Sequence, residues 1–139
     1  MQKYALLLLS VLFLFPFSTH AEAVNAGFVQ GLWYSSDVVF ADTPTRIYVA
    51  FRNNTPNDLT GTVRFIDNEK RIGSSNVSAL SGRLVEAWVD WSPTYGEHKL
   101  VVTLNNAEVH VIGEGPKPAT LADITVEETL SVDYDTDKD

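Results

Sequence analysis

The chain contains no cysteine among its 139 residues, and this absence excludes several kinds of chemistry. Without thiols there are no disulfides, no thiolate zinc sites, no cysteine nucleophile and no lipid-modified N-terminal cysteine. Packing alone must therefore stabilise the folded part. A single domain of this size is large enough to bury a sufficient core without crosslinks.

Signatures of catalysis are missing as well. The sequence has no G-x-S-x-G or S-x-x-K nucleophile motif, and only His98 and His110 remain once an N-terminal leader is removed. His98 is expected on an inward row near Trp91, as a neutral imidazole with one hydrogen bond. Neither histidine has other metal ligands at a suitable spacing. We therefore expect a protein that is not an enzyme.

Basic residues are few, with 10 Lys and Arg against 18 Asp and Glu, which gives a net charge of -8. Residues 123–139 carry six of these eight net negative charges, so the part before them is nearly balanced. Such a charge disfavours nucleic acid and anionic membrane surfaces as partners. The partners we expect are a protein or a cell-surface polysaccharide.

The N-terminal residues 1–23 have the pattern of a cleaved signal peptide. Lys3 precedes an apolar run over residues 4–17, and small residues form an A-x-A sequence at 21–23. The alternative, a transmembrane anchor, needs about 20 apolar residues, and this run is shorter and contains proline. We therefore predict a secreted product, extracellular or at the cell surface, with no membrane insertion after cleavage.

Residues 84–104 are the stretch around which the rest is organised, because two alternating rows meet there at a turn over residues 92–96. Residues 45–53 form the clearest single strand. Turn residues separate the β-rich runs at the short spacing typical of a β-sandwich. The two inward rows are Val85, Ala87, Val89 and Trp91, then His98, Leu100, Val102 and Leu104.

Several details follow for the remaining segments. Leu80 is expected to fill the core ahead of the organising pair, and residues 105–106 to form a hairpin turn that returns residues 108–112 beside the preceding strand. Residues 124–132 are another candidate for the last strand, with a bulge at Glu127-Glu128 that breaks the alternation. The sequence leaves open whether residues 107–112 or residues 124–132 form that last strand.

The tryptophans have different expected roles. Trp88 and Trp91 are three residues apart on one strand, so they face opposite sides of the sheet, and Trp91 belongs to the core. Trp88 either contacts a ligand or packs against Tyr48 or the terminal segment. Trp33 and Tyr34 have the same two possibilities, so all three aromatics are candidate interaction residues.

The acidic tail at residues 133–139 has a carboxylate at every second position. Asp135, Asp137 and Asp139 have the spacing with which calcium loops present oxygen ligands. A complete loop also needs a glycine at its sixth position and an acidic residue near its twelfth, both beyond Asp139. A solvated acidic tail without a cofactor is the alternative, and calcium is expected if the polypeptide continues past Asp139.

Three motifs together resemble a known family. The patterns I-x-V-x-F-x-N at 47–53, V-x-F-x-D-N at 63–68 and V-x-W-x-P from Val89 are similar to the cell-adhesion-related domain in bacteria (CARDB) over residues 28–112. The resemblance implies an all-β, immunoglobulin-like sandwich of about seven antiparallel strands, here residues 24–132, found in secreted and surface proteins without catalytic residues.

The tail has a resemblance of its own. Its sequence DYDTDKD is similar to the opening of an aspartate-rich calcium repeat of the thrombospondin type 3 kind, matched at Asp135, Asp137 and Asp139. The two resemblances together imply a non-catalytic structural or adhesive module. A carbohydrate-binding module that uses exposed aromatics is the alternative function.

Overall fold

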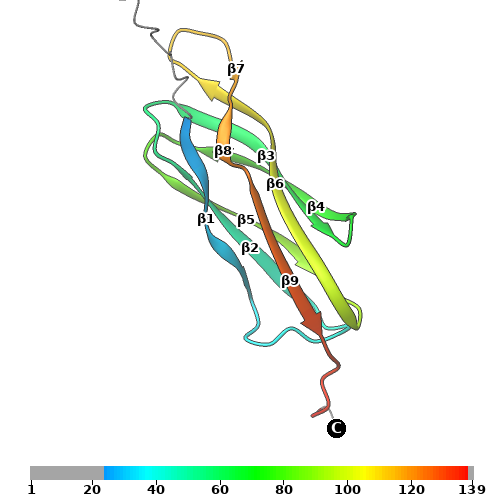
Figure 1. The fold of residues 1–139 in the computed structure, drawn as a ribbon. Helices are drawn as coiled ribbons and strands as arrows, with labels where there is room; N and C mark the ends of the chain where they lie inside the picture. Colours follow the sequence, from blue (N-terminus) through cyan, green and yellow to red (C-terminus); the bar gives the residue numbers. More distant parts are fainter. Residues whose placement is uncertain (1–23, 138–139) are drawn as a thin grey trace, which may run out of the picture.

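The computed structural model describes residues 24–137, which form nine β-strands packed as two sheets (Figure 1). The predicted signal peptide lies outside the described residues. Within residues 24–137, no helix is long and apolar enough to cross a membrane. The strands are β1 (Val24–Tyr34), β2 (Thr45–Asn53), β3 (Asp58–Asp67), β4 (Lys70–Ala79), β5 (Leu84–Trp91), β6 (Gly96–His110), β7 (Lys117–Pro118), β8 (Leu121–Asp123) and β9 (Thr125–Val132).

One sheet has the strand order β5-β2-β1-β8, and the other has the order β4-β3-β6-β7 with β9 also paired to β6. All pairs between neighbouring strands are antiparallel except β1 with β8. The segment that contains β8 and β9 changes sheet at Ile124, where the carbonyl of Ile124 accepts a hydrogen bond from the Leu104 amide at 2.9 Å. The predicted all-β sandwich is therefore confirmed.

The core lies between the two sheets and consists of alternate residues of each strand, as expected when one face of each strand is buried. Both inward rows predicted around the corner are confirmed, with Val85 and Val89 only partly buried. Phe28 and Phe51 meet edge to face at 5.8 Å between ring centroids. The largest fully buried side chains include Phe51, Phe65, Ile47, Leu59, Leu100, Val49, Val63, Val102 and Val132.

The predicted hairpin at residues 105–106 is wrong, because β6 continues through it to His110. Asn106 does adopt a positive φ of 53°, but this conformation makes a bulge within the ladder instead of a reversal. Thr60 pairs with Glu108 and Thr62 with Asn105, so β6 has one residue more than β3 at this point. Asparagine tolerates positive φ in turns and in bulges alike, so its presence did not distinguish the two.

Two other expectations are corrected. Residues 124–132 do contain the last long strand, but its pairing with β6 is regular and has no bulge at Glu127-Glu128. Glu128 keeps the alternation and points to the same side as Val126 and Leu130, because its carboxylate has a hydrogen-bond donor there. Leu80 does not fill the core; it lies in the turn before β5 and is largely exposed.

The opposite faces of Trp88 and Trp91 lead to a prediction about stability. Trp91 is buried at the end of β5, whereas Trp88 is 47% exposed. We expect Trp91→Ala to lower the free energy of unfolding by about 3–5 kcal/mol, as for other large core truncations, and Trp88→Ala to lower it little. Denaturant unfolding of the two variants measures the difference. Equal losses would contradict the assignment of faces.

Candidate functional site

Three aromatic side chains form a row across the outer face of the four-stranded sheet. Trp33 of β1 pairs with Tyr48 of β2, and Tyr48 pairs with Trp88 of β5. The rings of Trp33 and Tyr48 are stacked, with 5.5 Å between centroids and 7° between planes. We call Trp33, Tyr48 and Trp88 the aromatic row. Residues far apart in the sequence thus form one contiguous surface.

An irregularity in β1 sets the position of Trp33 in this row. Val29 pairs with Ala50 and Trp33 with Tyr48, so β1 uses four residues where β2 uses two. Gln30 takes up the extra length with a φ of 64°. Because two residues are added, the alternation of faces is kept and Trp33 still points outward.

A charged pair lies directly beside the aromatic row. The guanidinium carbon of Arg46 lies 3.7 Å from the ring centroid of Trp88, and Arg46 Nε donates to Asp90 Oδ1 at 2.9 Å. Arg46 and Asp90 are themselves opposite one another in the β2 and β5 pairing. The hydrogen bond to Asp90 raises the pKa of the Arg46 guanidinium above its ordinary value. The cation is therefore fixed over one face of Trp88.

A shallow depression of about 220 Å³ adjoins this pair. Its walls offer hydroxyl groups, a cation, a carboxylate and an aromatic ring within one small area, which is the mixture that recognises a polar ligand. The lining residues are Ser35, Pro44, Thr45, Arg46, Tyr48 and Asp90.

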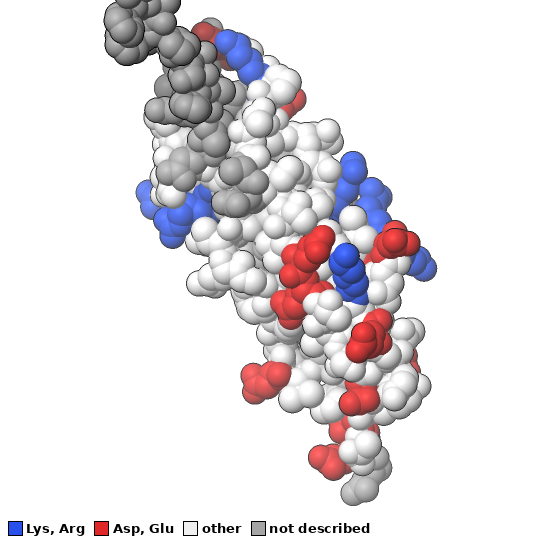
Figure 2. Space-filling model, in the orientation of Figure 1, with Lys and Arg blue, Asp and Glu red and all other residues white. Residues whose placement is uncertain are grey.

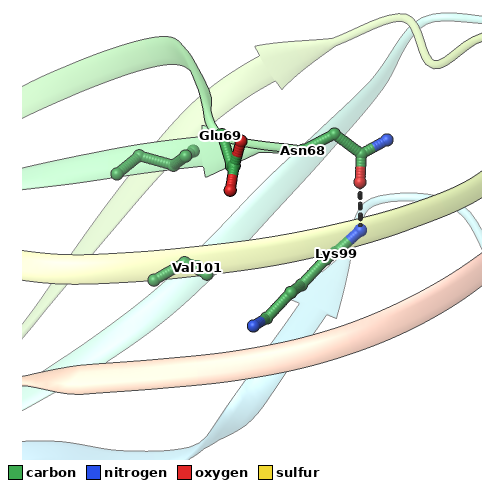
Figure 3. A pocket seen from close by; sticks show the side chains of 5 residues that line it. Asn68, Glu69, Lys99 and Val101 are labelled. Atoms are coloured by element: carbon green, nitrogen blue, oxygen red, sulfur yellow. Dashed lines mark hydrogen bonds between the residues drawn. The ribbon is translucent and has the colours of Figure 1, made fainter.

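A larger hollow lies on the outer face of the other sheet, beside the turn between β3 and β4 (Figure 3). Asn68 Oδ1 accepts a hydrogen bond from the backbone amide of Lys99 at 2.8 Å, and Asn68 Nδ2 donates to the carbonyl of Glu97 at 3.0 Å. Asn68 and Glu69 both have positive φ, as expected in a tight hairpin turn. The Asn68 side chain thus holds the hairpin against β6, and it is not free for a ligand.

Asp67 and His98 form a pair with the residue types of an acid–base dyad, but a substrate cannot reach it because both side chains are largely buried. Both carboxylate oxygens of Asp67 lie 2.8 Å from His98 Nδ1, and Trp91 Nε1 donates to Asp67 Oδ2 at 3.2 Å. His98 Nε2 lies 2.7 Å from the carbonyl oxygen of Thr94. Trp91 and the corner at Thr94 are thus both connected to the Asp67 and His98 pair, and both ring nitrogens of His98 have a partner, where one hydrogen bond was expected.

This arrangement closes His98 to substrates. Its side chain is 4% exposed, and both nitrogens are already occupied, so no position remains from which it could take a proton from a bound molecule. Among the described residues, no group of three or more His, Cys, Asp or Glu side chains could hold a metal ion.

The predicted calcium residues are only partly covered by the structure. Asp135 and Asp137 follow β9, and the Asp137 amide donates to Asp135 Oδ1 at 3.1 Å. Asp139 lies outside the described residues. The exposed rings of Tyr134 and Tyr95 stack at 5.2 Å between centroids, which holds this segment against the corner between β5 and β6. The calcium repeat stays a prediction.

Tyr34, predicted together with Trp33 and Trp88, lies on the opposite face of the sheet. It pairs with the buried Ile47, and its hydroxyl donates to Glu128 Oε1 at 2.9 Å. Its ring lies 6.5 Å from that of Trp91. Burial, followed by the hydrogen bond to Glu128, raises the pKa of the Tyr34 phenol above its ordinary value. Tyr34 thus links the two sheets and is not part of the aromatic row.

Sequence reasoning did not include Tyr48, Arg46 and Asp90 among the site residues. Alternation places Tyr48 and Arg46 on the outward face of their strand, but it does not give the register between strands. Only the register places Tyr48 between Trp33 and Trp88 and Arg46 opposite Asp90.

Comparisons with known proteins support the fold. No family model matches this chain, and no curated protein matches it by sequence. The structure is similar to the CARDB domain of a Pyrococcus furiosus protein, crystallised in complex with di-metal ions, with a TM-score of 0.60, 16% identity, and coverage of 80% of this chain and 90% of that one. A solution structure of a CARDB domain from the same organism is similar with a TM-score of 0.57 and 17% identity, and the match covers 79% of this chain and 97% of that one. The predicted CARDB-like, immunoglobulin-like sandwich fold is therefore confirmed.

The buried pair leads to a prediction about stability. Asp67→Ala leaves His98 Nδ1 and Trp91 Nε1 without acceptors in the core. We expect it to lower the free energy of unfolding by about 2–6 kcal/mol, because two buried donors each lose their acceptor, at a cost of about 1–3 kcal/mol each. Asp90→Ala, which breaks the exposed pair with Arg46, is the control and should have little effect. Similar losses in chemical denaturation would contradict this account.

Tyr34 gives a prediction about alkaline pH. The unfolded chain ionises this phenol near its ordinary pKa of about 10, but the folded chain keeps it protonated to higher pH. The free energy of unfolding should therefore be unaffected by Tyr34 below about pH 10 and should fall as the pH rises above that value. We expect Tyr34→Phe to remove this part of the fall, measured by denaturant unfolding across the alkaline range.

The control for this pH dependence is Tyr95→Phe, because Tyr95 is an exposed phenol at the surface. It should leave the alkaline fall unchanged. An alkaline fall in Tyr34→Phe as steep as that of the unaltered protein would show that Tyr34 does not cause it.

Proposed function

We propose that this chain is a non-catalytic module, secreted or displayed at a cell surface, that makes adhesive contact with a protein partner through the outer face of its four-stranded sheet. The observation that carries the proposal is the aromatic row with Arg46 beside it. Trp, Tyr and Arg are the residue types enriched at the energetic centres of protein interfaces.

The rigidity of this surface supports the proposal. Trp33 and Tyr48 hold one another by stacking, and Arg46 is held between Trp88 and Asp90. Side chains that are already ordered lose less conformational entropy when a partner binds. The side chains of the aromatic row are therefore preorganised for binding.

The distribution of charge agrees with a partner of this kind. On the face drawn in Figure 2, Asp and Glu side chains predominate toward the end where β9 leaves the sandwich. The aromatic row carries no charge itself; Arg46 and Asp90 beside it neutralise one another, and Glu86, two residues before Trp88 on β5, adds one carboxylate. A largely neutral, aromatic patch favours a protein surface over an anionic polymer.

Binding of a polysaccharide is the second candidate, favoured by the depression next to the aromatic row. Its hydroxyls and its charged pair could bond to sugar hydroxyls while a ring packs against the sugar. One face of Trp33 is covered by Tyr48, however, and one face of Trp88 by Arg46. The aromatic area left for a sugar is therefore smaller than the row suggests, and we place the protein partner first.

We propose a non-catalytic module because His98, the histidine that contacts a carboxylate, is closed to substrates. Within residues 24–137, Asp67 and His98 are the only carboxylate and histidine in contact. The His98 side chain is buried, and both of its nitrogens are bonded within the protein. The exposed Arg46 and Asp90 pair is joined by a hydrogen bond and has no nucleophile arranged beside it.

Binding to a cell-surface fraction tests the proposal. We expect Trp88→Ala to weaken binding by about 2 kcal/mol or more, as for a central interface residue. Ile112→Ala, which truncates a fully exposed apolar side chain at residue 112, outside the aromatic row, is the matched control and should bind normally. Protease treatment of the fraction should remove the binding.

A panel of soluble glycans separates the two candidates. A shift in tryptophan fluorescence that is lost in Trp88→Ala, together with binding that survives protease treatment, would replace the protein partner by a polysaccharide. Binding that is unchanged in Trp88→Ala would exclude the aromatic row as the contact surface for either partner.

A further inference from the structure

The first strand, β1, pairs in parallel with β8, and β9 continues from β8 in the same direction along the other sheet (Figure 1). Val24 pairs with Leu121 and Gly27 with Asp123 in a parallel arrangement. Farther along, Tyr34 of β1 is bonded to Glu128 of β9. The chain therefore comes into β1 at one end of the long axis and leaves β9 at the other.

The attachment of β9 to the sandwich is long and regular. It pairs with β6 from Thr103 with Thr125 to Gly96 with Val132, which makes eight consecutive pairs without a shift. A pull on the chain after Val132 acts along the axis of β9. All the hydrogen bonds of this ladder, which lie across the strands, are then strained together instead of one after another.

Contacts on the other side attach the same segment to the first sheet. β8 pairs with β1, and the hydroxyl of Tyr34 bonds to Glu128 in the middle of β9. Because the segment changes sheet at Ile124, sliding it along its axis disturbs both sheets. The last segment is therefore held by the whole sandwich and not by one neighbour.

The point where the chain leaves the sandwich is also fixed. The carbonyl of Asp133 accepts a hydrogen bond from the Ala41 amide at 2.8 Å, and Asp133 forms a parallel bridge with Phe40. Tyr134 stacks on Tyr95. These contacts keep the segment after Val132 in line with β9 instead of letting it bend back across β6.

From this geometry we infer that the module carries tension from its outer aromatic face to the polypeptide that follows β9. The source of the tension, a partner bound at the aromatic row, rests on the function proposed above. The resistance itself depends only on the direction and pairing of the strands. A pull along the long axis meets the full β6 and β9 ladder in shear.

The absence of cysteine makes the test direct, because two introduced cysteines define the pulling axis in a single-molecule experiment. The shear axis uses Glu86→Cys on β5 with Thr136→Cys after β9. The zipper axis uses Glu97→Cys with Ser131→Cys, which are opposite one another at one end of the ladder. All four positions are exposed.

At equal pulling speed we expect the shear axis to need a severalfold higher unfolding force than the zipper axis, where the pairs break one at a time. Equal forces, or a lower force on the shear axis, would overturn the inference. No partner is present in this experiment, so its result is independent of whether the aromatic row binds anything.

A matched pair of variants tests the connection between the two sheets. Tyr34→Phe removes the hydroxyl that bonds to Glu128, and it should lower the unfolding force on the shear axis. On the zipper axis the force acts first on the pair Glu97 and Ser131, away from Glu128, so the force there should change little. Tyr95→Phe, an exposed position, should change neither force. An unchanged shear force in Tyr34→Phe would remove this bond from the account.

Discussion

The carboxylate of Asp67 holds the two sheets together where β3, β5 and the corner before β6 meet. It lies at the end of β3 in one sheet and accepts from Trp91 at the end of β5 in the other. It also pairs with His98, whose second nitrogen holds the carbonyl of Thr94 in the corner. Apolar contacts alone would allow several arrangements of such a corner, whereas directional hydrogen bonds can form in only one of them. These bonds attach the end of β5, the strand that carries Trp88, to the other sheet.

The sequence predicted those features that depend on alternation within a strand. The inward rows around Trp91 and His98 are correct, and so is the outward position of Trp88, because burial of one face imposes a period of two.

The features that failed depend on partners distant in sequence. Asn106 could begin a hairpin or a bulge, and only its pairing with β3 decides which. Glu127-Glu128 was read as a bulge because the two glutamates interrupt the apolar alternation, and the donor that accommodates Glu128 on the inward row, Tyr34, lies 94 residues away. The aromatic row was missed as a unit for the same reason, since each of its members comes from a different strand.

The sheet change at Ile124 has a consequence for the order of folding. The edge of β6 stays unpaired until residues 125–132 have been made, and β1 lacks its parallel neighbour until residues 121–123 are present. Neither sheet can reach its final width from the first hundred residues alone. Parallel pairing between the two ends of a chain closes a large loop and forms late. The newly made chain therefore exposes an open, apolar strand edge for most of its synthesis, which is the state in which a protein of this kind most needs protection from aggregation.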